Sequence, residues 1–443
     1  MRNLTSKKCI LILLDGIGDR SYEQLDNQTP LQAAKTPVLD KLAAGGSNGL
    51  YHAALLGQAL PSENAHFLMF GYDMTDFPGR GVLEALGAGI ELGAKDVAVL
   101  SHFVCLSESG GYLIVDERKP RISEDEVADL VQAVEKYETD DVIIRFIPTK
   151  GIFGIITLSG DVAPFITDSD PFVENQPLIE LAPWADHSQN MACGNTAAAL
   201  KDYLVWVYHR LTSHPVNLLR IKEGHPPING FVTQRAGQLK VVTSFRHRYG
   251  LRGISIASGM VYWGLSAYVG MDYRQVDDTD DPGRDLAERL TMARKALNDG
   301  YDFVHVHTKA TDEAAHTKDP DVKKTVIESL DRAMGKAIGP VMDDPGVLII
   351  ITADHSTPSS GPLIHSGESV PLTFFGQGVR RDRVSRFDEV SAAAGALGNV
   401  RGKELMYLLL NHLDRAKLQG VMDTPIDQPY WPGDYEPFRI ERK

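Results

Sequence analysis

Residues 346–355 read GVLIIITADH, an apolar run that ends in a carboxylate and an imidazole. Six of its first eight residues are apolar, which predicts a strand buried on both faces and places Asp354 and His355 at its carboxyl end. Open α/β sheets bind their ligands at that end of the strands. Both side chains can ligate a metal ion, and His365 follows ten residues later across a loop rich in Ser, Pro and Gly. A loop cap and a surface imidazole are the competing interpretation.

A second carboxylate follows a second predicted strand near the amino terminus. Residues 7–14 read KKCILILL and lead into Asp15 and a tight turn with Gly16 and Gly18. The glycine pair lacks the third glycine and the acidic residue of a dinucleotide-binding fingerprint, so we do not expect a nucleotide site there. Asp15 alone is as consistent with a turn residue as with a ligand.

Residues 60–71 predict a helix that begins near Ser62. A serine hydroxyl at that position can cap the free amides of the first turn, which is what most such serines do. The same position also suits a phosphate carried by the hydroxyl oxygen, because a helix amino terminus stabilises negative charge. Both interpretations of Ser62 remain open at this point.

A third potential ligand group follows the strand predicted by DFVHVH at 302–307. Asp312 and His316 are four residues apart, so on a helical turn they lie on one face and can reach one ion, although a surface pair is the simpler interpretation. Asp15, Asp312 and the pair at 354–355 all follow predicted strands of a βα-type sheet, so they should converge on one edge. Two divalent ions about 4 Å apart recur in phosphoryl chemistry. The seven candidate ligands suit such a pair: Asp15, Ser62, Asp312, His316, Asp354, His355 and His365.

The pattern changes between about residues 76 and 228. Short strand-like pieces at 111–116 and 142–146 flank an amphipathic helix at 124–136, which predicts a compact inserted α+β unit. The core pattern returns with a strand at 253–257. We therefore predict an α/β fold with a central, mostly parallel sheet flanked by helices. Its core domain comprises residues 1–75 and 229–443, and residues 76–228 form the smaller inserted domain.

The composition is that of an ordinary globular protein, with 443 residues of which 43% are hydrophobic. Its net charge of -14 argues against a general nucleic-acid surface, so an anionic ligand would need locally placed cations or a metal. The three cysteines lack zinc-ligand spacing, which indicates a reducing compartment. No segment has the length of a secretory signal or a membrane span. We expect a cytoplasmic protein without a nucleic-acid or membrane partner, and a Pro-rich strap or tail at 423–443.

Longer motifs extend these patterns over nearly the whole chain. They are LDGIGD at 14–19, TPLQAAKTPVLDKL at 29–42, FGYD at 70–73, GRG with EALGAGIEL at 79–92, HPVN at 214–217, KATDEAAH at 309–316, and TADHSTP with HSG at 352–367. In these motifs the chain resembles the archaeal-type, cofactor-independent phosphoglycerate mutases of the alkaline phosphatase superfamily. The resemblance implies an alkaline-phosphatase-like core and an isomerase that interconverts 3- and 2-phosphoglycerate in glycolysis without 2,3-bisphosphoglycerate.

The resemblance also implies roles for individual residues. Ser62 would be the phosphorylated nucleophile. One divalent ion (Mn, Zn, Mg or Co) would be held by Asp15, Ser62, Asp354 and His355, and a second by Asp312, His316 and His365. The inserted domain is the natural lid for excluding water from a small phosphorylated substrate. Four side chains are candidates for gripping the phosphate and carboxylate of that substrate: His214, Arg220, Arg235 and Lys309.

The chain departs from the family pattern on the substrate side. The family reads glycine-serine-aspartate-threonine around the nucleophile, where this chain has PSEN at 61–64. Where the family has proline-phenylalanine, this chain has Val82-Leu83. It has QRAG at 234–237 in place of arginine-glycine-alanine-glycine, and Phe172 in place of the histidine of an aspartate-proline-histidine motif. Because the candidate metal ligands are all present, we expect the reaction class to be kept. A mutase or hydrolase for a related phosphate or phosphonate is the alternative, and a non-catalytic, metal-stabilised binding protein is the least favoured.

Overall fold

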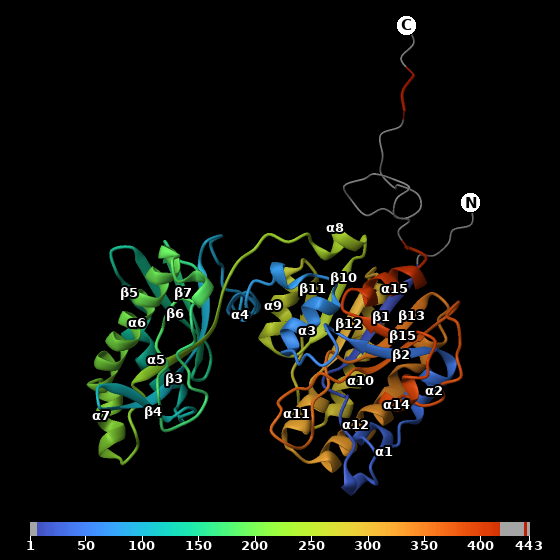
Figure 1. Ribbon diagram of the computed structural model, residues 1–443, viewed down its shortest axis with the longest axis horizontal. Coiled ribbons are helices and arrows are strands. Elements are labelled where there is room, and N and C mark those ends of the chain that lie inside the picture. The colour runs from blue at the N-terminus through green and yellow to red at the C-terminus, as the bar shows by residue number, and fades with distance from the viewer. Residues whose placement is uncertain (1–6, 417–437, 441–443) are drawn as a thin grey trace. The chain divides into compact units, whose positions relative to one another are not determined.

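The computed structural model describes residues 7–416 and 438–440, so the tail expected from residue 423 onward lies almost entirely outside it (Figure 1). The chain divides into two compact units: Met1–Phe77 with Val242–Lys443, and Pro78–Val241. The second unit extends beyond the expected end at residue 228, because strand β9 (Gly230–Gln238) pairs antiparallel with β3 (Val97–Ser109) of the same unit. The boundary placed at 228 was therefore wrong by one strand.

The first unit is built on an eight-stranded sheet of order β11-β10-β12-β1-β13-β14-β2-β15. The strands from β11 to β13 in this order all pair in parallel, while β14 runs antiparallel to both of its neighbours. The strands in this order are Asp272–Gln275, Gly253–Ala257, Phe303–Thr308, Lys8–Leu14, Val347–Thr352, Val370–Phe375, Ser47–His52 and Gly398–Arg401. This arrangement confirms the α/β fold with a mostly parallel sheet.

The central strands are buried because helices cover the sheet (Figure 1). All six residues of β12 and of β13 are buried, as are six of the seven of β1, which is expected of parallel strands enclosed on both faces. Helices α10 (Pro282–Asn298) and α12 (Pro320–Ala337) pack against each other. Both begin with proline behind an aspartate that caps the first turn, Asp281 and Asp319 respectively.

The register of the three central strands decides where the polar turns begin. Leu14 of β1 lies opposite Thr308 of β12, and Leu13 lies opposite Thr352 of β13. Each strand therefore ends at the same level of the sheet. The turn after β1, the helix α11 (Ala310–His316) after β12 and the loop after β13 all start at this edge.

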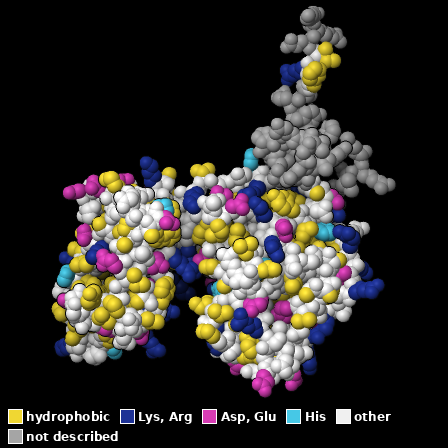
Figure 2. Space-filling model, in the orientation of Figure 1, with side chains coloured by type: hydrophobic (Ala, Val, Ile, Leu, Met, Phe, Trp, Pro, Cys, Tyr) yellow, Lys and Arg dark blue, Asp and Glu magenta, His cyan; other side chains and the backbone are white. Residues whose placement is uncertain are grey.

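The remaining helices of the first unit connect and cover these strands. They are α1 (Pro30–Ala33), α2 (Pro37–Gly45), α3 (Ser62–Met69), α8 (Phe245–Tyr249), α9 (Met260–Tyr268), α13 (Gly339–Met342), α14 (Glu389–Ala392) and α15 (Glu404–His412). No helix in the described part of the chain has the length and hydropathy needed to cross a membrane. In Figure 2, Lys and Arg side chains are interspersed with Asp and Glu over the visible face and do not gather into one basic surface.

The second unit has its own antiparallel sheet and core. Its path is β5-β6-β7-β3-β4-β8, and β9 pairs with β3 beside that path. The rings of Phe103, Phe146 and Phe231 pack together in its core, and the centroids of Phe103 and Phe146 each lie 4.4 Å from that of Phe231. Besides β3 and β9, its elements are α4 (Arg80–Gly87), β4 (Tyr112–Glu117), α5 (Glu124–Val134), β5 (Lys136–Glu138), β6 (Val142–Lys150), β7 (Phe153–Gly160), β8 (Gln176–Pro177), α6 (Met191–Thr212) and α7 (Pro215–Lys222).

Candidate metal centre

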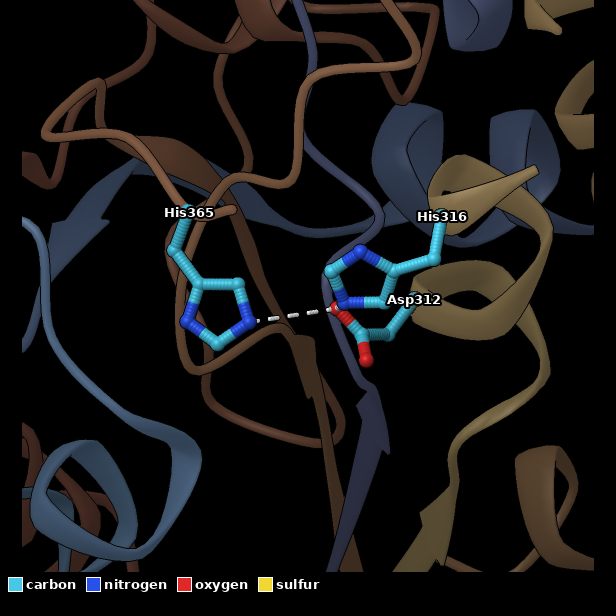
Figure 3. Close-up of side chains that lie close together, drawn as sticks. All are labelled: Asp312, His316 and His365. Carbon is cyan, nitrogen blue, oxygen red and sulfur yellow. Dashed lines mark ion pairs between the residues drawn. The ribbon is translucent and has the colours of Figure 1, made fainter. Parts of the chain in front are cut away.

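Two groups of metal-ligating side chains meet at the carboxyl edge of the large sheet. Asp15, Asp354 and His355 form the first cluster; the second cluster contains Asp312 together with two imidazoles, His316 and His365. Within each cluster the candidate ligand atoms lie within 4.8 Å of one another. In Figure 3, His316 and Asp312 project from one helix while His365 approaches from a separate loop. The structure thus brings together six of the predicted ligands in the two groups that were expected.

Ser62 is the seventh predicted ligand and lies against the first cluster. Its Oγ is 2.9 Å from His355 Nε2, and the side chain is buried. Pro61, not Ser62, occupies the N-cap of α3, and that N-cap makes no side-chain capping bond. The capping interpretation of Ser62 is therefore wrong, because the proline moves the helix start by one residue and leaves the hydroxyl free to face His355.

The first cluster leaves buried carboxylate oxygens without hydrogen-bond donors. His355 Nε2 lies 3.4 Å from Asp15 Oδ1 and 3.1 Å from Asp354 Oδ2. Among the described residues, neither of these two oxygens has a hydrogen-bond partner, although both are buried. An unpaired buried carboxylate oxygen costs free energy, and a cation would remove that cost. The donor set of two carboxylates, an imidazole and a hydroxyl oxygen fits a divalent ion.

The charges in the first cluster point in the same direction. Burial raises the pKa of Asp15 well above its ordinary value, and the nearby negative charges of Asp354 and Asp312 raise it further. Burial also lowers the pKa of His355 to about 4, so its imidazole is neutral near pH 7 and its nitrogen lone pair can serve as a ligand. A bound cation would stabilise the ionised form of Asp15 beside the other two carboxylates.

The second cluster is less enclosed than the first. Asp312 Oδ1 lies 3.3 Å from His316 Nε2 and 3.5 Å from His365 Nε2. Burial alone would raise the pKa of Asp312, but hydrogen bonds from these two imidazoles hold it well below its usual range. His365 Nδ1 donates to the carbonyl of Leu60 at 2.7 Å, which directs Nε2 toward Asp312. The His316 side chain is 37% exposed, so this cluster faces solvent.

Sequence reasoning missed several residues that orient the predicted ligands. Tyr262 OH donates to Asp15 Oδ2 at 3.0 Å, and His307 Nε2 lies 3.0 Å from the same oxygen. His66 Nδ1 donates to the backbone carbonyl of Ser62 at 2.8 Å. His307 ends the strand predicted from VHVH, so a buried histidine at a strand end was a usable signal; Tyr262 and His66 lie on helices, where the pattern gave none.

The four predicted substrate-binding residues occupy different environments. Lys309 precedes α11, and its positive charge opposes the upward pKa shift of Asp15. The other three belong to the second unit. His214 caps α7 through Nδ1, and the Arg220 guanidinium donates to the Pro226 carbonyl at 3.2 Å while pairing with Glu126 at 3.4 Å. Arg235 has a φ of 52°, and its amide donates to Asp168. Their contact with substrate stays a prediction.

The profile of the metalloenzyme superfamily matches residues 7–412. A Methanocaldococcus jannaschii protein named 2,3-bisphosphoglycerate-independent phosphoglycerate mutase 2 is 40% identical over 439 residues, which cover 97% of this chain and 98% of the relative. The chain belongs to this mutase family of metalloenzymes. A Methanopyrus kandleri relative with the same enzyme name is 36% identical, with 94% of this chain and 98% of the relative covered.

Solved structures agree with this membership. A Pyrococcus horikoshii protein of 29% identity superposes with a TM-score of 0.77 over 94% of this chain and 100% of its own. The cofactor-independent phosphoglycerate mutase of Thermoplasma acidophilum is 30% identical, with a TM-score of 0.64 over 92% of this chain and 100% of its own. The chain is accordingly an enzyme of the isomerase class and a metalloenzyme.

Proposed function

We propose that the protein interconverts 3-phosphoglycerate and 2-phosphoglycerate through a phosphorylated Ser62, without 2,3-bisphosphoglycerate. The observation that carries the proposal is the position of Ser62 Oγ, 2.9 Å from His355 Nε2 and beside carboxylate oxygens that lack donors. An isolated serine hydroxyl is a weak nucleophile and needs such activation. The enzyme names of the relatives suggest the substrate. The proposal places the reaction in glycolysis, in the cytoplasm.

The proposal assigns two divalent ions, manganese among those that suit these ligands, to the two clusters. Asp15, Ser62, Asp354 and His355 would hold one, and the residues of the second cluster would hold the other. When bound, the ions supply positive charge that lowers the pKa of the serine hydroxyl and neutralises the phosphoryl oxygens. Tyr262 and His307 keep Asp15 oriented, so the chain holds its ligands in place before substrate arrives.

Phosphoryl transfer then proceeds in two balanced steps. Ser62 Oγ forms a bond to phosphorus as the ester bond to the glycerate oxygen breaks, giving phosphoserine and an alcohol that takes up the proton. The neighbouring hydroxyl of the retained glycerate then attacks the phosphoserine and regenerates Ser62. Lys309, His214, Arg220 and Arg235 would bind the substrate's anionic groups. The second unit would exclude water, which otherwise takes the place of the glycerate hydroxyl and yields phosphate.

The test combines metal content with two activity assays. We expect purified protein to bind divalent ions and, with manganese or magnesium, to convert 3-phosphoglycerate in an enolase-coupled assay. A general phosphomonoester assayed in parallel should release little phosphate. Phosphate release without formation of 2-phosphoglycerate would defeat the mutase assignment, and a folded protein that binds no divalent ion would defeat both enzymatic hypotheses.

A second candidate function is a mutase or hydrolase for a related phosphate or phosphonate. It is favoured by the surroundings of Phe172, which stands where the family has histidine and adopts a φ of 63°. The Arg118 guanidinium lies 5.7 Å from the Phe172 ring centroid and pairs with Asp170 at 2.6 Å. Gln234 donates to the same carboxylate, so the altered residues form one connected group. Turnover of another phosphate ester in the absence of 3-phosphoglycerate activity would select this candidate.

A further inference from the structure

The side chain of Thr357 lies between the two metal clusters. Its hydroxyl oxygen is 2.8 Å from Asp312 Oδ1 in the second cluster and 3.1 Å from His355 Nδ1 in the first. Thr357 is fully buried, so water does not compete for these bonds. The rings of His355 and His365 also stack, with centroids 3.7 Å apart, so a ligand of the first cluster is in direct contact with a ligand of the second.

The proton positions in the series of hydrogen bonds from His355 through Thr357 to Asp312 follow from the ionised state of Asp312. An ionised Asp312 can only accept, so the Thr357 hydroxyl donates to it. The hydroxyl oxygen then accepts from His355, which must carry its proton on Nδ1. His355 Nε2 is left as a lone pair facing Ser62 and the first cluster. One hydroxyl therefore fixes the tautomer of one metal ligand and the orientation of another.

The backbone around Thr357 is held firmly. Its amide donates to the Gly18 carbonyl at 3.0 Å, and Lys323 Nζ donates to the Thr357 carbonyl at 2.8 Å. Gly16 has a φ of 65°, and a Cβ on it would lie 2.4 Å from Thr357 Oγ1. The glycine turn after β1 thus leaves just enough room for the hydroxyl to reach Asp312.

We propose that Thr357 is a positioning residue that couples the loading of the two metal sites. The inference rests on the two-ion site of the proposed function. An ion on His355 Nε2 polarises the Nδ1–H bond, which strengthens the hydrogen bond to Thr357 and, through it, the bond that orients Asp312. By thermodynamic linkage an ion in the second cluster favours the first cluster to the same degree. The two ions should therefore bind as a pair.

The test uses Mn²⁺ binding and electron paramagnetic resonance on the full chain. With one equivalent of Mn²⁺, we expect the wild-type spectrum to be that of exchange-coupled pairs beside empty protein. In Thr357→Val, which removes the hydroxyl and keeps the shape, we expect isolated ions at one equivalent. We also expect affinity to fall by roughly 10–100-fold, the usual effect of losing a residue that orients a ligand. Thr357→Ser should restore the paired spectrum.

A matched control is Thr373→Val in β14, because the Thr373 hydroxyl is equally buried but donates to Asn48 Oδ1 of the neighbouring strand β2, away from the ligands. Its Mn²⁺ spectrum and affinity should match the wild type. Isolated ions in the wild type at one equivalent, or paired ions at wild-type affinity in Thr357→Val, overturn the coupling while leaving the two-ion site intact. If Thr357→Val does not fold, Gly16→Ala is the second variant, because its methyl group would lie 2.4 Å from Thr357 Oγ1 and displace the hydroxyl; paired ions at wild-type affinity in that variant overturn the coupling. A wild type that binds no Mn²⁺ instead refutes the proposed function.

Discussion

Lys323→Met should destabilise the first unit and loosen both ligand-bearing loops. Lys323 is fully buried, and its ammonium donates to the carbonyls of Gly18 and Thr357 at 2.9 and 2.8 Å and to Asp19 Oδ2 at 3.0 Å. Gly18 lies in the turn that follows Asp15, and Thr357 lies two residues beyond His355. One ammonium group thus connects the loops that carry the first cluster.

The expected cost is about 3 kcal/mol of unfolding free energy. Breaking a buried ion pair by removing one partner costs about 3–5 kcal/mol, because the remaining charge stays buried. The lower end applies here, since Asp19 keeps donors from the Ser359 amide and hydroxyl and from Tyr22. The Gly18 carbonyl also keeps the Thr357 amide, and methionine refills most of the lysine volume.

The loss of unfolding free energy is measured by urea unfolding of the metal-free protein, with hydrogen exchange in the segments 15–19 and 354–359 as the readout. Hydrogen exchange is needed because the chain has two units, for which a single unfolding free energy is not defined. Lys336→Met, an exposed lysine on the same helix, is the control and should change the free energy by less than about 0.5 kcal/mol.

A double-mutant cycle with Asp19→Asn separates the ion pair from the other bonds. Because the neutral asparagine removes the stranded charge, Lys323→Met should cost less in that background than in the wild type. Additive costs of the two substitutions, or a cost of Lys323→Met below about 1 kcal/mol, would refute the reasoning that the pair holds these loops.

Three further predictions concern the same edge of the sheet. Ser62→Ala should abolish the phosphoenzyme and turnover while metal content measured by mass spectrometry is mostly retained; near wild-type turnover would remove Ser62 as nucleophile. Gly16→Ala should weaken Mn²⁺ binding, measured by calorimetry, at least tenfold. Its new methyl group would lie 2.4 Å from Thr357 Oγ1 and would push that hydroxyl away from Asp312; unchanged binding would contradict this close approach. Glu389, whose enclosed carboxylate accepts from the Asp19 amide and the Thr29 hydroxyl, has a pKa raised to about 7 by burial. Since the folded state then holds a proton that the unfolded state releases near pH 4.5, wild-type stability relative to Glu389→Gln should be greatest below pH 4.5. It should fall by at most roughly 3 kcal/mol as the pH rises through 7, and parallel stability curves for the two proteins would exclude the shift.

The parts of the fold that the sequence predicted share one property: they are encoded locally. Strands β1 and β13 are single apolar runs, β12 alternates apolar residues with histidines, and the ligands Asp15 and Asp354 follow within two residues of the ends of β1 and β13. Given parallel strands, a common edge follows without knowledge of their order. The boundary at 228 was misplaced because β9 lies next to the core in sequence but pairs with β3, more than a hundred residues away. No local pattern reports such a pairing.

The residues that position the ligands could not be found in the same way. Thr357 follows His355 by two residues and would pass for an ordinary loop threonine, and its role depends on Asp312, 45 residues earlier. Tyr262 reaches Asp15 across 247 residues. Their contribution is a hydrogen bond whose partner is chosen by the tertiary fold, so the residue type alone carries little information.

The positioning residues also distinguish a catalytic metal site from one that only stabilises a fold. Seven ligands could persist in a protein that merely needs an ion to fold, because any geometry that binds the ion would serve. Here Thr357 sets the tautomer of His355, so that a nitrogen lone pair faces the Ser62 hydroxyl at 2.9 Å. Tyr262 restrains Asp15, and Lys323 restrains the loops on both sides. Structural binding of an ion does not require a nucleophile held in this way, whereas phosphoryl transfer does. The supporting residues, more than the number of ligands, therefore favour catalysis.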